Sequence, residues 1–194
     1  LRRILTAAVM ALLFVVVAGA DTARAADWPQ FLGPDRNGIS KETGLVQSWG
    51  SSGPKELWRI PGGVGMTSVV VQGKLACTMV QTQGEQRLLA FDAATGKEKW
   101  SAKIAPTYRN QMGNGPRGTP ALSKDAAFVF TGEGVLARVS LKDGNVDWKV
   151  DTLKELPGRS AEYGMACSPI LWGEAVVVQI GARQATVAAF SQKT

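Results

Sequence analysis

Short apolar runs separated by polar turns recur along most of the chain. Runs of this kind occupy residues 75–80, 126–130 and 175–180, and each follows directly on Lys, Asp or Glu. They are rich in Val, Ala and Phe, and they are shorter than most helices. Short runs of this composition between turn residues predict β-strands.

One phrase is written twice and begun a third time. Residues 88–100 read LLAFDAATGKEKW, residues 136–148 read LARVSLKDGNVDW, and a third copy starts at 186 as TVAAFSQKT. The first two copies lie 48 residues apart, and the third stops with the chain at Thr194. A repeat of this period predicts an array of similar small units. Because the array is interrupted within a unit, we expect the chain to be an N-terminal fragment.

A second phrase precedes each copy of the first and aligns Ser68 with Thr119 and Ser168. Together the two phrases predict four strands per unit. The predicted ranges are 67–71, 75–81, 87–92 and 97–103 in the first unit, 118–122, 126–131, 134–140 and 145–151 in the second, and 167–171, 175–180 and 185–190 in the third. The third unit lacks its fourth strand, and a lone strand of the fourth kind is predicted at 56–60.

The turn before each fourth strand has a clear physical basis. In the segment from Asp92 to Gly96, the carboxylate can accept a backbone N–H, and the glycine can take a positive φ without a Cβ clash. A tryptophan recurs on the fourth strand, where a large ring can fill the gap between neighbouring sheets. The structural repeat residues are Trp58, Asp92, Gly96, Trp100, Gly144 and Trp148.

Four-stranded antiparallel units repeated at this period are typical of β-propeller blades. We therefore predict an all-β fold, a β-propeller of four-stranded antiparallel blades, with an incomplete ring of about two and three-quarter blades. Known propellers use about 4–8 blades. The lone strand around Trp58 would complete the last blade by pairing with strands from the C-terminus. The predicted propeller domain covers residues 56–194 and follows an N-terminal extension at 26–55.

Residues 1–25 predict a secretory signal peptide. Arg2 and Arg3 precede an apolar run at 4–20, and Ala23-Arg24-Ala25 offers a small-x-small cleavage site. The run is at the short end for a transmembrane helix, which leaves an uncleaved anchor as the alternative. The expected location is periplasmic or extracellular, with no stable membrane span after cleavage.

Composition excludes several kinds of chemistry from this chain. The formal net charge is +6, but the basic residues are scattered, so no nucleic-acid partner is predicted. There is no histidine, which excludes Ser-His-Asp and Cys-His nucleophilic systems and His-metal sites. Cys77 and Cys167 lie two units apart in the repeat, which predicts two separate, small buried side chains.

Two short motifs have the spacing of ligand sites, but their context favours simple turns. Residues 113–118 satisfy G-x-G-x-x-G, yet a strand pattern with Pro120 follows in place of the helix that a dinucleotide site needs. Residues 143–147 have the D-x-N-x-D spacing of a calcium loop, but Trp148 and Lys154 stand where an EF-hand needs Gly and Glu. No metal site is predicted.

Two loops, around residues 108–112 and 159–163, run from an outer strand to the inner strand of the next unit. They should end near the central channel, where propellers usually bind ligands. Their side chains could hold an anionic or polyol ligand, although polar loop residues are also common without any ligand. The candidate ligand-binding residues are Arg109, Asn110, Asn114, Arg117, Glu162 and Tyr163. We expect Arg117 to face the channel mouth, and no catalytic residue is identified.

The pattern L-x-A-F-D-x-x-T-G-x-x-x-W at 88–100 resembles the repeat of the pyrroloquinoline-quinone (PQQ)-like propellers. The segments DWPQFLGPDRNG at 27–38, GPRGTP at 115–120 and GMACSP at 164–169 are similar to a secreted subgroup of these proteins. The superfamily includes quinoprotein alcohol dehydrogenases and the lipoprotein scaffold of the outer-membrane β-barrel assembly machine. The resemblance covers roughly residues 27–194 and implies the fold more specifically than the function.

Three functions remain open under this resemblance. The leading expectation is a non-catalytic binding or scaffold module, whose partner is a protein or a small polar or polyol ligand. The alternative is a PQQ- and calcium-dependent dehydrogenase of alcohols or sugars, with calcium as Lewis acid; a third is a carbohydrate- or polymer-binding module. The dehydrogenases typically show an adjacent Cys-Cys pair and hold calcium with Glu, Asn and Asp, whereas no Cys-Cys pair occurs here. PQQ and calcium are therefore expected only under the alternative.

Overall fold

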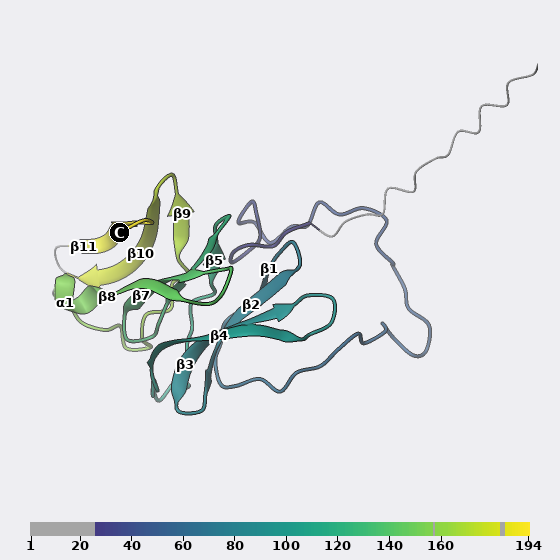
Figure 1. Ribbon diagram of the computed structural model, residues 1–194, viewed down its shortest axis with the longest axis horizontal. Coiled ribbons are helices and arrows are strands. Elements are labelled where there is room, and N and C mark those ends of the chain that lie inside the picture. Colours follow the sequence, from purple (N-terminus) through teal and green to yellow (C-terminus); the bar gives the residue numbers. More distant parts are fainter. Residues whose placement is uncertain (1–25, 157, 183–184) are drawn as a thin grey trace, which may run out of the picture.

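The computed structural model describes residues 26–156, 158–182 and 185–194. The predicted signal peptide at 1–25 lies outside the described residues. Within them, three antiparallel β-sheets follow one another in chain order, from teal through green to yellow (Figure 1). None of the helices in the described part is long and apolar enough to cross a membrane.

Each sheet is a meander in which consecutive strands pair as antiparallel neighbours. The strands are β1 (Val70–Gln72), β2 (Leu75–Thr82), β3 (Glu85–Asp92) and β4 (Glu98–Pro106) in the first sheet, β5 (Ala121–Leu122), β6 (Ala126–Phe130), β7 (Val135–Ser140) and β8 (Val146–Asp151) in the second, and β9 (Ile170–Trp172), β10 (Ala175–Ala182) and β11 (Ala185–Ser191) in the third. One short helix, α1 (Thr152–Glu155), follows β8. The predicted all-β propeller fold is confirmed, and the described sheets do not close a ring.

The inner strands β1, β5 and β9 each begin three residues later than predicted. The residues before them make side-chain hydrogen bonds between blades in place of a strand ladder. The Ser68 N–H donates to Thr119 Oγ1 at 3.0 Å, and the Thr119 N–H donates to Ser168 Oγ at 3.0 Å. The aligned hydroxyl residues therefore link the three blades at their inner edges.

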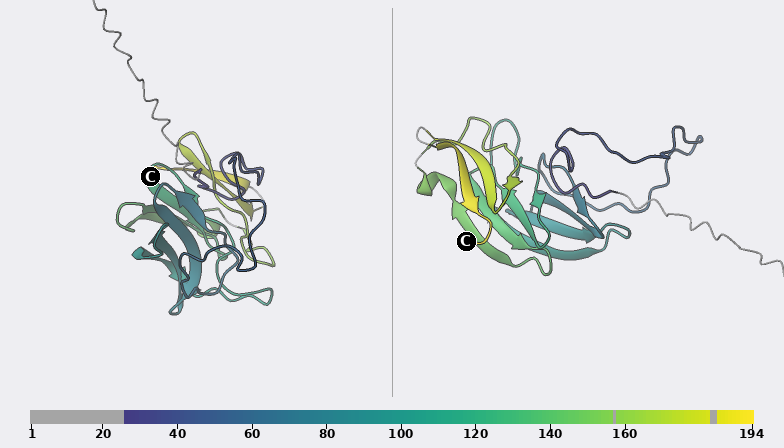
Figure 2. Two further views of the ribbon diagram at one scale, coloured as in Figure 1. Left: turned by 90° about the vertical axis from the view of Figure 1, so that its right-hand side faces the viewer. Right: turned by 90° about the horizontal axis from the view of Figure 1, so that it is seen from above.

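The hydrophobic core lies between the sheets. All five residues of β6 are buried, and their side chains alternate between two clusters. Ala127 and Val129 belong to the cluster shared with the first sheet, and Phe128 and Phe130 to the cluster shared with the third. Successive side chains of a strand point to opposite faces, so the middle blade buries both of its faces. Figure 2 shows the sheets side by side in this order.

Each blade receives a tryptophan from the preceding part of the chain on the turn after its third strand. The indole N–H donates to a backbone carbonyl at the same repeat position in every case: Trp58 to Ala93 at 3.0 Å, Trp100 to Leu141 at 3.1 Å, and Trp148 to Gln192 at 3.3 Å. The Trp100 and Trp148 contacts join neighbouring blades, each through a large apolar ring and one hydrogen bond.

The predicted strand at 56–60 is not a strand in this structure. Among the described residues, no segment pairs with its backbone, and a strand exists only through such pairing. Trp58 nevertheless lies against Gly96 in the way that Trp100 lies against Gly144. The tryptophan therefore docks without a strand to carry it.

The turn between β3 and β4 forms as its sequence indicates. Asp92 Oδ1 accepts hydrogen bonds from the Ala94 and Thr95 backbone N–H groups at 3.2 and 3.1 Å, and from the Thr95 hydroxyl at 2.9 Å. The hydroxyl bond, followed by a bond from Lys99, holds the pKa of Asp92 below its usual value. Gly96 has a φ of +70°, a conformation that glycine adopts without steric cost.

The N-terminal segment 27–38 crosses the inner strands of all three blades. Its contacts are two backbone bonds between Trp28 and Val71 at 2.8 and 3.0 Å, a bond from Leu122 N–H to Pro29 O at 2.8 Å, and a bond from Arg36 Nη2 to Leu171 O at 3.0 Å. This part of the predicted N-terminal extension therefore contacts the inner edge of all three blades.

Candidate functional site

Tyr108 anchors the loop that connects the first blade to the second. Its backbone N–H donates to Gln81 Oε1 at 2.7 Å. Its ring lies against Gly132, where a Cβ would meet the ring at 2.7 Å, and its hydroxyl lies against Gly164 in the next loop. The absence of side chains at these two glycines lets one tyrosine contact both the turn between β6 and β7 and the loop before β9.

Arg117 is buried within the first loop, with 8% of its surface exposed. Its Nη1 and Nη2 atoms donate to the carbonyls of Gly115 and Gly113, each at 2.7 Å. The guanidinium carbon also lies 4.9 Å from the centre of the Tyr108 ring, which is the range of a cation–π contact. Arg117 therefore braces its own loop, and its expected exposure at the channel mouth stays a prediction for the complete ring.

Asn110 ties the two loops together. Its Nδ2 atom donates to Glu162 O at 2.8 Å and to the Tyr108 hydroxyl at 3.2 Å. Its backbone N–H donates to Asn114 Oδ1 at 3.1 Å. Three of the six candidate residues are therefore joined by hydrogen bonds that hold the loop backbones.

The other candidates contribute exposed side chains to the same surface. Arg109, Asn114 and Glu162 are exposed, and Tyr163 is 52% exposed. Met112, at 59% exposure, adds an apolar side chain that sequence reasoning did not single out. The two loops thus present charged, amide, aromatic and thioether groups on a braced backbone, which we call the loop surface.

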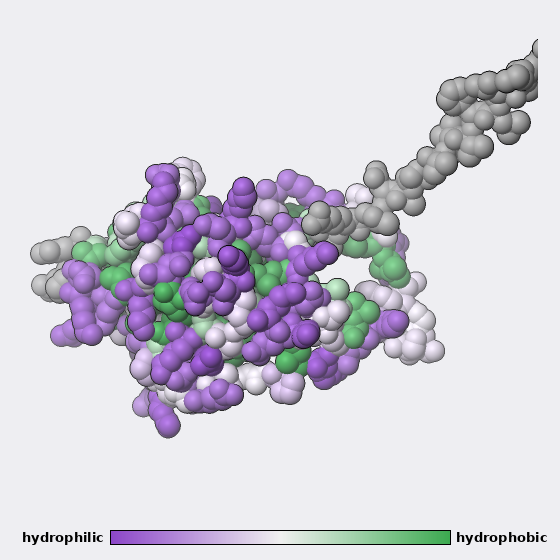
Figure 3. All heavy atoms as spheres, viewed as in Figure 1, coloured by the Kyte–Doolittle hydropathy of each residue, from purple (hydrophilic) through white to green (hydrophobic). Residues whose placement is uncertain are grey.

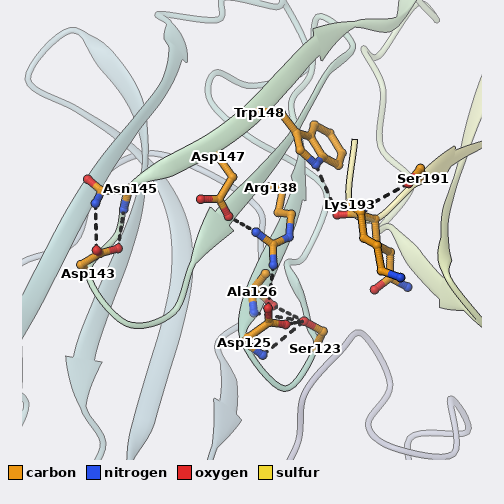
Figure 4. Close-up of polar contacts among 11 residues, drawn as sticks. Ser123, Asp125, Ala126, Arg138, Asp143, Asn145, Asp147, Trp148, Ser191 and Lys193 are labelled. Atoms are coloured by element: carbon orange, nitrogen blue, oxygen red, sulfur yellow. Dashed lines mark hydrogen bonds and ion pairs between the residues drawn. The ribbon is translucent and has the colours of Figure 1, made fainter.

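The calcium-like spacing at 143–147 is used for protein contacts (Figure 4). The two carboxylate oxygens of Asp143 accept from the backbone and side-chain nitrogens of Asn145 at 3.2 and 2.8 Å. Bonds from Ser140 and then Asn145 hold the pKa of Asp143 below its usual value. Asp147 instead pairs with Arg138, which also binds Asp125 at 2.7 Å.

The G-x-G-x-x-G motif at 113–118 forms a close approach between backbones. Gly115 has a φ of +84°, and a Cβ there would lie 2.5 Å from the carbonyl oxygen of Val64. The chain continues into β5, so the helix that a dinucleotide site needs is replaced by a strand.

A sequence model of the family described as outer membrane protein assembly factor BamB matches residues 35–194. The chain belongs to this family of PQQ-like repeat proteins. No curated protein matches the chain in sequence.

Solved structures share the propeller fold of this PQQ-like repeat chain. A quinohemoprotein alcohol dehydrogenase from Comamonas testosteroni is 18% identical with a TM-score of 0.57, and the match covers 90% of this chain and 27% of that one. A europium-containing methanol dehydrogenase is 18% identical with a TM-score of 0.50, over 69% of this chain and 24% of that one. BamB from Moraxella catarrhalis is 25% identical with a TM-score of 0.46, over 69% and 34%. The chain therefore spans between 24% and 34% of the length of these proteins.

The cysteines of this PQQ-like repeat chain lie in different blades. Cys77 on β2 is buried and free, and Cys167 before β9 is half-buried and free. The backbone N–H of Gln179 donates to the Cys167 sulfur at 3.2 Å. Across residues 26–156, 158–182 and 185–194, no three Cys, Asp or Glu side chains gather as a metal site.

Proposed function

We propose that this chain is the blade-forming part of an exported PQQ-like propeller that binds a partner protein or a small polar ligand without catalysis. The observation that carries the proposal is the bracing of the loop surface. Arg117 donates to two carbonyls of its own loop. Asn110 donates to a carbonyl of the second loop and to the Tyr108 hydroxyl. A surface held in this way is preorganised, which lowers the entropy lost on binding.

The exposed part of the loop surface has the composition of a recognition site. An exposed tyrosine, an arginine and a methionine lie on the two loops, and these residue types are enriched at protein interfaces. Hydrophilic side chains cover most of the blades on the face drawn in Figure 3. The predicted signal peptide at 1–25 supports export to the periplasm or the outside of the cell.

Site-specific crosslinking in cells tests the proposal. A photoreactive amino acid replaces Tyr163 on the loop surface or, as the matched control, Lys124 in the turn between β5 and β6 at the opposite end of the blade. We expect a discrete crosslinked product from position 163 and none from 124. Equal crosslinking at both positions would remove the support for a specific surface.

Dye reduction by the full-length protein separates binding from the dehydrogenase alternative. The protein is incubated with PQQ, calcium and a panel of alcohols and sugars, beside a control without quinone. We expect no rate above that control. Quinone-dependent reduction would overturn the non-catalytic proposal in favour of the dehydrogenase.

A further inference from the structure

A cleft of about 560 Å³ lies between the first two blades, beside the loop surface, with which it shares Tyr108. Its lining residues come from β4, β7, β8 and α1 and from the segments next to them. Its volume is within the range of ligand pockets, about 300–1,000 Å³. The lining residues are Ile104, Ala105, Pro106, Thr107, Tyr108, Glu133, Val135, Lys149, Asp151 and Lys154.

Glu133 is held in this cleft by a buried amide. Gln86 is fully buried, and its Nε2 atom lies 2.8 and 2.9 Å from the two carboxylate oxygens of Glu133. The same nitrogen donates to Pro106 O at 2.9 Å, whereas Gln86 Oε1 has no partner among the described residues. A buried polar atom without a partner is unfavourable, so the fixed orientation of Glu133 is maintained at a cost to stability.

The carboxylate of Glu133 has no cationic partner within the described residues. Its contact is with a neutral amide, and no lysine or arginine of the described chain forms an ion pair with it. A half-buried carboxylate without a cation attracts an ammonium or guanidinium group.

Lys149 provides the opposite charge further along the cleft. Asp151 pairs with Lys154 at 3.0 Å, and within the described residues no carboxylate pairs with Lys149. Lys149 lies opposite Ala137 on β7, whereas Glu133 lies in the turn just before β7. The first residues of β7 and the end of this turn separate the two positions, which at the rise of a strand places the two residues on the order of 10 Å apart.

Apolar groups and one neutralised ion pair lie between the two charges. Pro106 and Tyr108 line the cleft from the first blade and Val135 from the second, and Asp151, opposite Val135, is already paired with Lys154. A complementary ligand therefore has a cation at one end, an anion at the other, and an apolar body between them. An extended peptide spans about 3.4 Å per residue, so three or four residues with free termini match this spacing.

We propose that the cleft between the first two blades binds a short extended peptide, with its N-terminal ammonium on Glu133 and its C-terminal carboxylate on Lys149. The cleft shares Tyr108 with the loop surface, but Glu133 and Lys149, which hold the ends of the peptide, lie outside that surface, so the proposal does not depend on the function proposed above. Apolar side chains of the peptide would lie on Pro106 and Val135.

Calorimetric titration of the full-length protein with the tetrapeptide Leu-Ala-Ala-Leu tests this proposal. The peptide is used with free termini, N-acetylated, or C-amidated. We expect acetylation of the peptide and Glu133→Gln in the protein each to weaken binding by about tenfold or more, since each removes one side of a charged hydrogen bond. Because both changes remove the same contact, the acetylated peptide should bind Glu133→Gln no more weakly than it binds the unchanged protein.

Lys149→Ala and C-amidation form the second matched pair. Lys149 is exposed on β8, so its replacement keeps the test independent of any folding defect caused by Glu133→Gln. Glu155→Gln and Lys142→Ala remove the same charges outside the cleft and should change affinity less than twofold. The proposal is overturned if the free tetrapeptide does not bind at millimolar concentration, if acetylation weakens binding to Glu133→Gln as much as to the unchanged protein, or if a doubly capped peptide with an internal arginine binds better than the free tetrapeptide.

Discussion

The indole of Trp100 lies directly on Gly144, although the two residues belong to different blades. A Cβ built on Gly144 would lie 2.8 Å from Cδ2 of the indole. The indole N–H donates to Leu141 O at 3.1 Å, in the same turn. Gly144 is therefore required for two reasons. A side chain would collide with the indole, and its φ of +76° is a conformation that favours glycine.

Replacing Gly144 with alanine should destabilise the protein for both reasons. We expect Gly144→Ala to lower the free energy of unfolding by about 3 kcal/mol, of which about 1–2 kcal/mol comes from the left-handed backbone and the rest from displacing the indole. Gly84→Ala is the matched control, because Gly84 has a φ of +77° and no atom near its Cβ position. Urea unfolding should show only the backbone cost for Gly84→Ala, and equal losses would contradict the docking role.

The indole hydrogen bond can be tested apart from the ring. Trp100→Phe keeps an aromatic ring and removes the donor to Leu141 O, so we expect a loss of about 1 kcal/mol in the free energy of unfolding. Trp172→Phe is the control, because Trp172 is 74% exposed. If both variants have the same unfolding midpoint in urea, the hydrogen bond contributes nothing measurable.

The blades could be predicted from sequence because their determinants are local and periodic. A short apolar run between turn residues specifies β6, and the spacing of Gly96 and Trp100 specifies the turn and the docking ring. The lone strand at 56–60 could not be tested by pattern alone, because strand formation depends on a partner outside its own sequence.

The loop surface was harder to predict because its contacts join residues without a common period. The loop sequence showed that Arg117 is polar and charged, but it did not show that two carbonyls of its own loop lie within reach. The role of Tyr108 depends on Gly132 and Gly164, which come from two later segments. Glycines opposite an aromatic residue are a weak sequence signal for such packing.

We expect the replacement of Arg117 to lower the stability of the loop surface, whether or not a ligand is bound. Arg117→Met keeps much of the side-chain volume and leaves the Gly113 and Gly115 carbonyls without their donors. We expect a loss of about 2–4 kcal/mol and faster amide hydrogen exchange in residues 109–118. Arg109→Met, at an exposed position, should change neither. Unchanged exchange in Arg117→Met would show that the loop is held by other contacts.

Cys77 should make stability depend on pH in the alkaline range. Burial raises the pKa of the Cys77 thiol to about 12, so the folded state holds this proton more tightly than the unfolded state does. The resulting stabilisation is complete below the ordinary thiol pKa and is lost as the pH rises from that value toward about 12. The free energy of unfolding should therefore fall across this window, and the part of the slope due to Cys77 should vanish in Cys77→Ala.

The same burial should slow the chemical modification of Cys77. Thiolates are the reactive form, and Cys77 is fully buried whereas Cys167 is half-buried. In Cys167→Ser the remaining thiol is Cys77, which should react with a disulfide reagent only on unfolding. In Cys77→Ala the remaining thiol is Cys167, which should react measurably in the folded protein. Burial also raises the pKa of Cys167, so its rate should still be below that of a small free thiol and should increase with pH. Equal rates for the two single-cysteine variants at pH 8 would contradict the placement of Cys77 in the core between the first two blades.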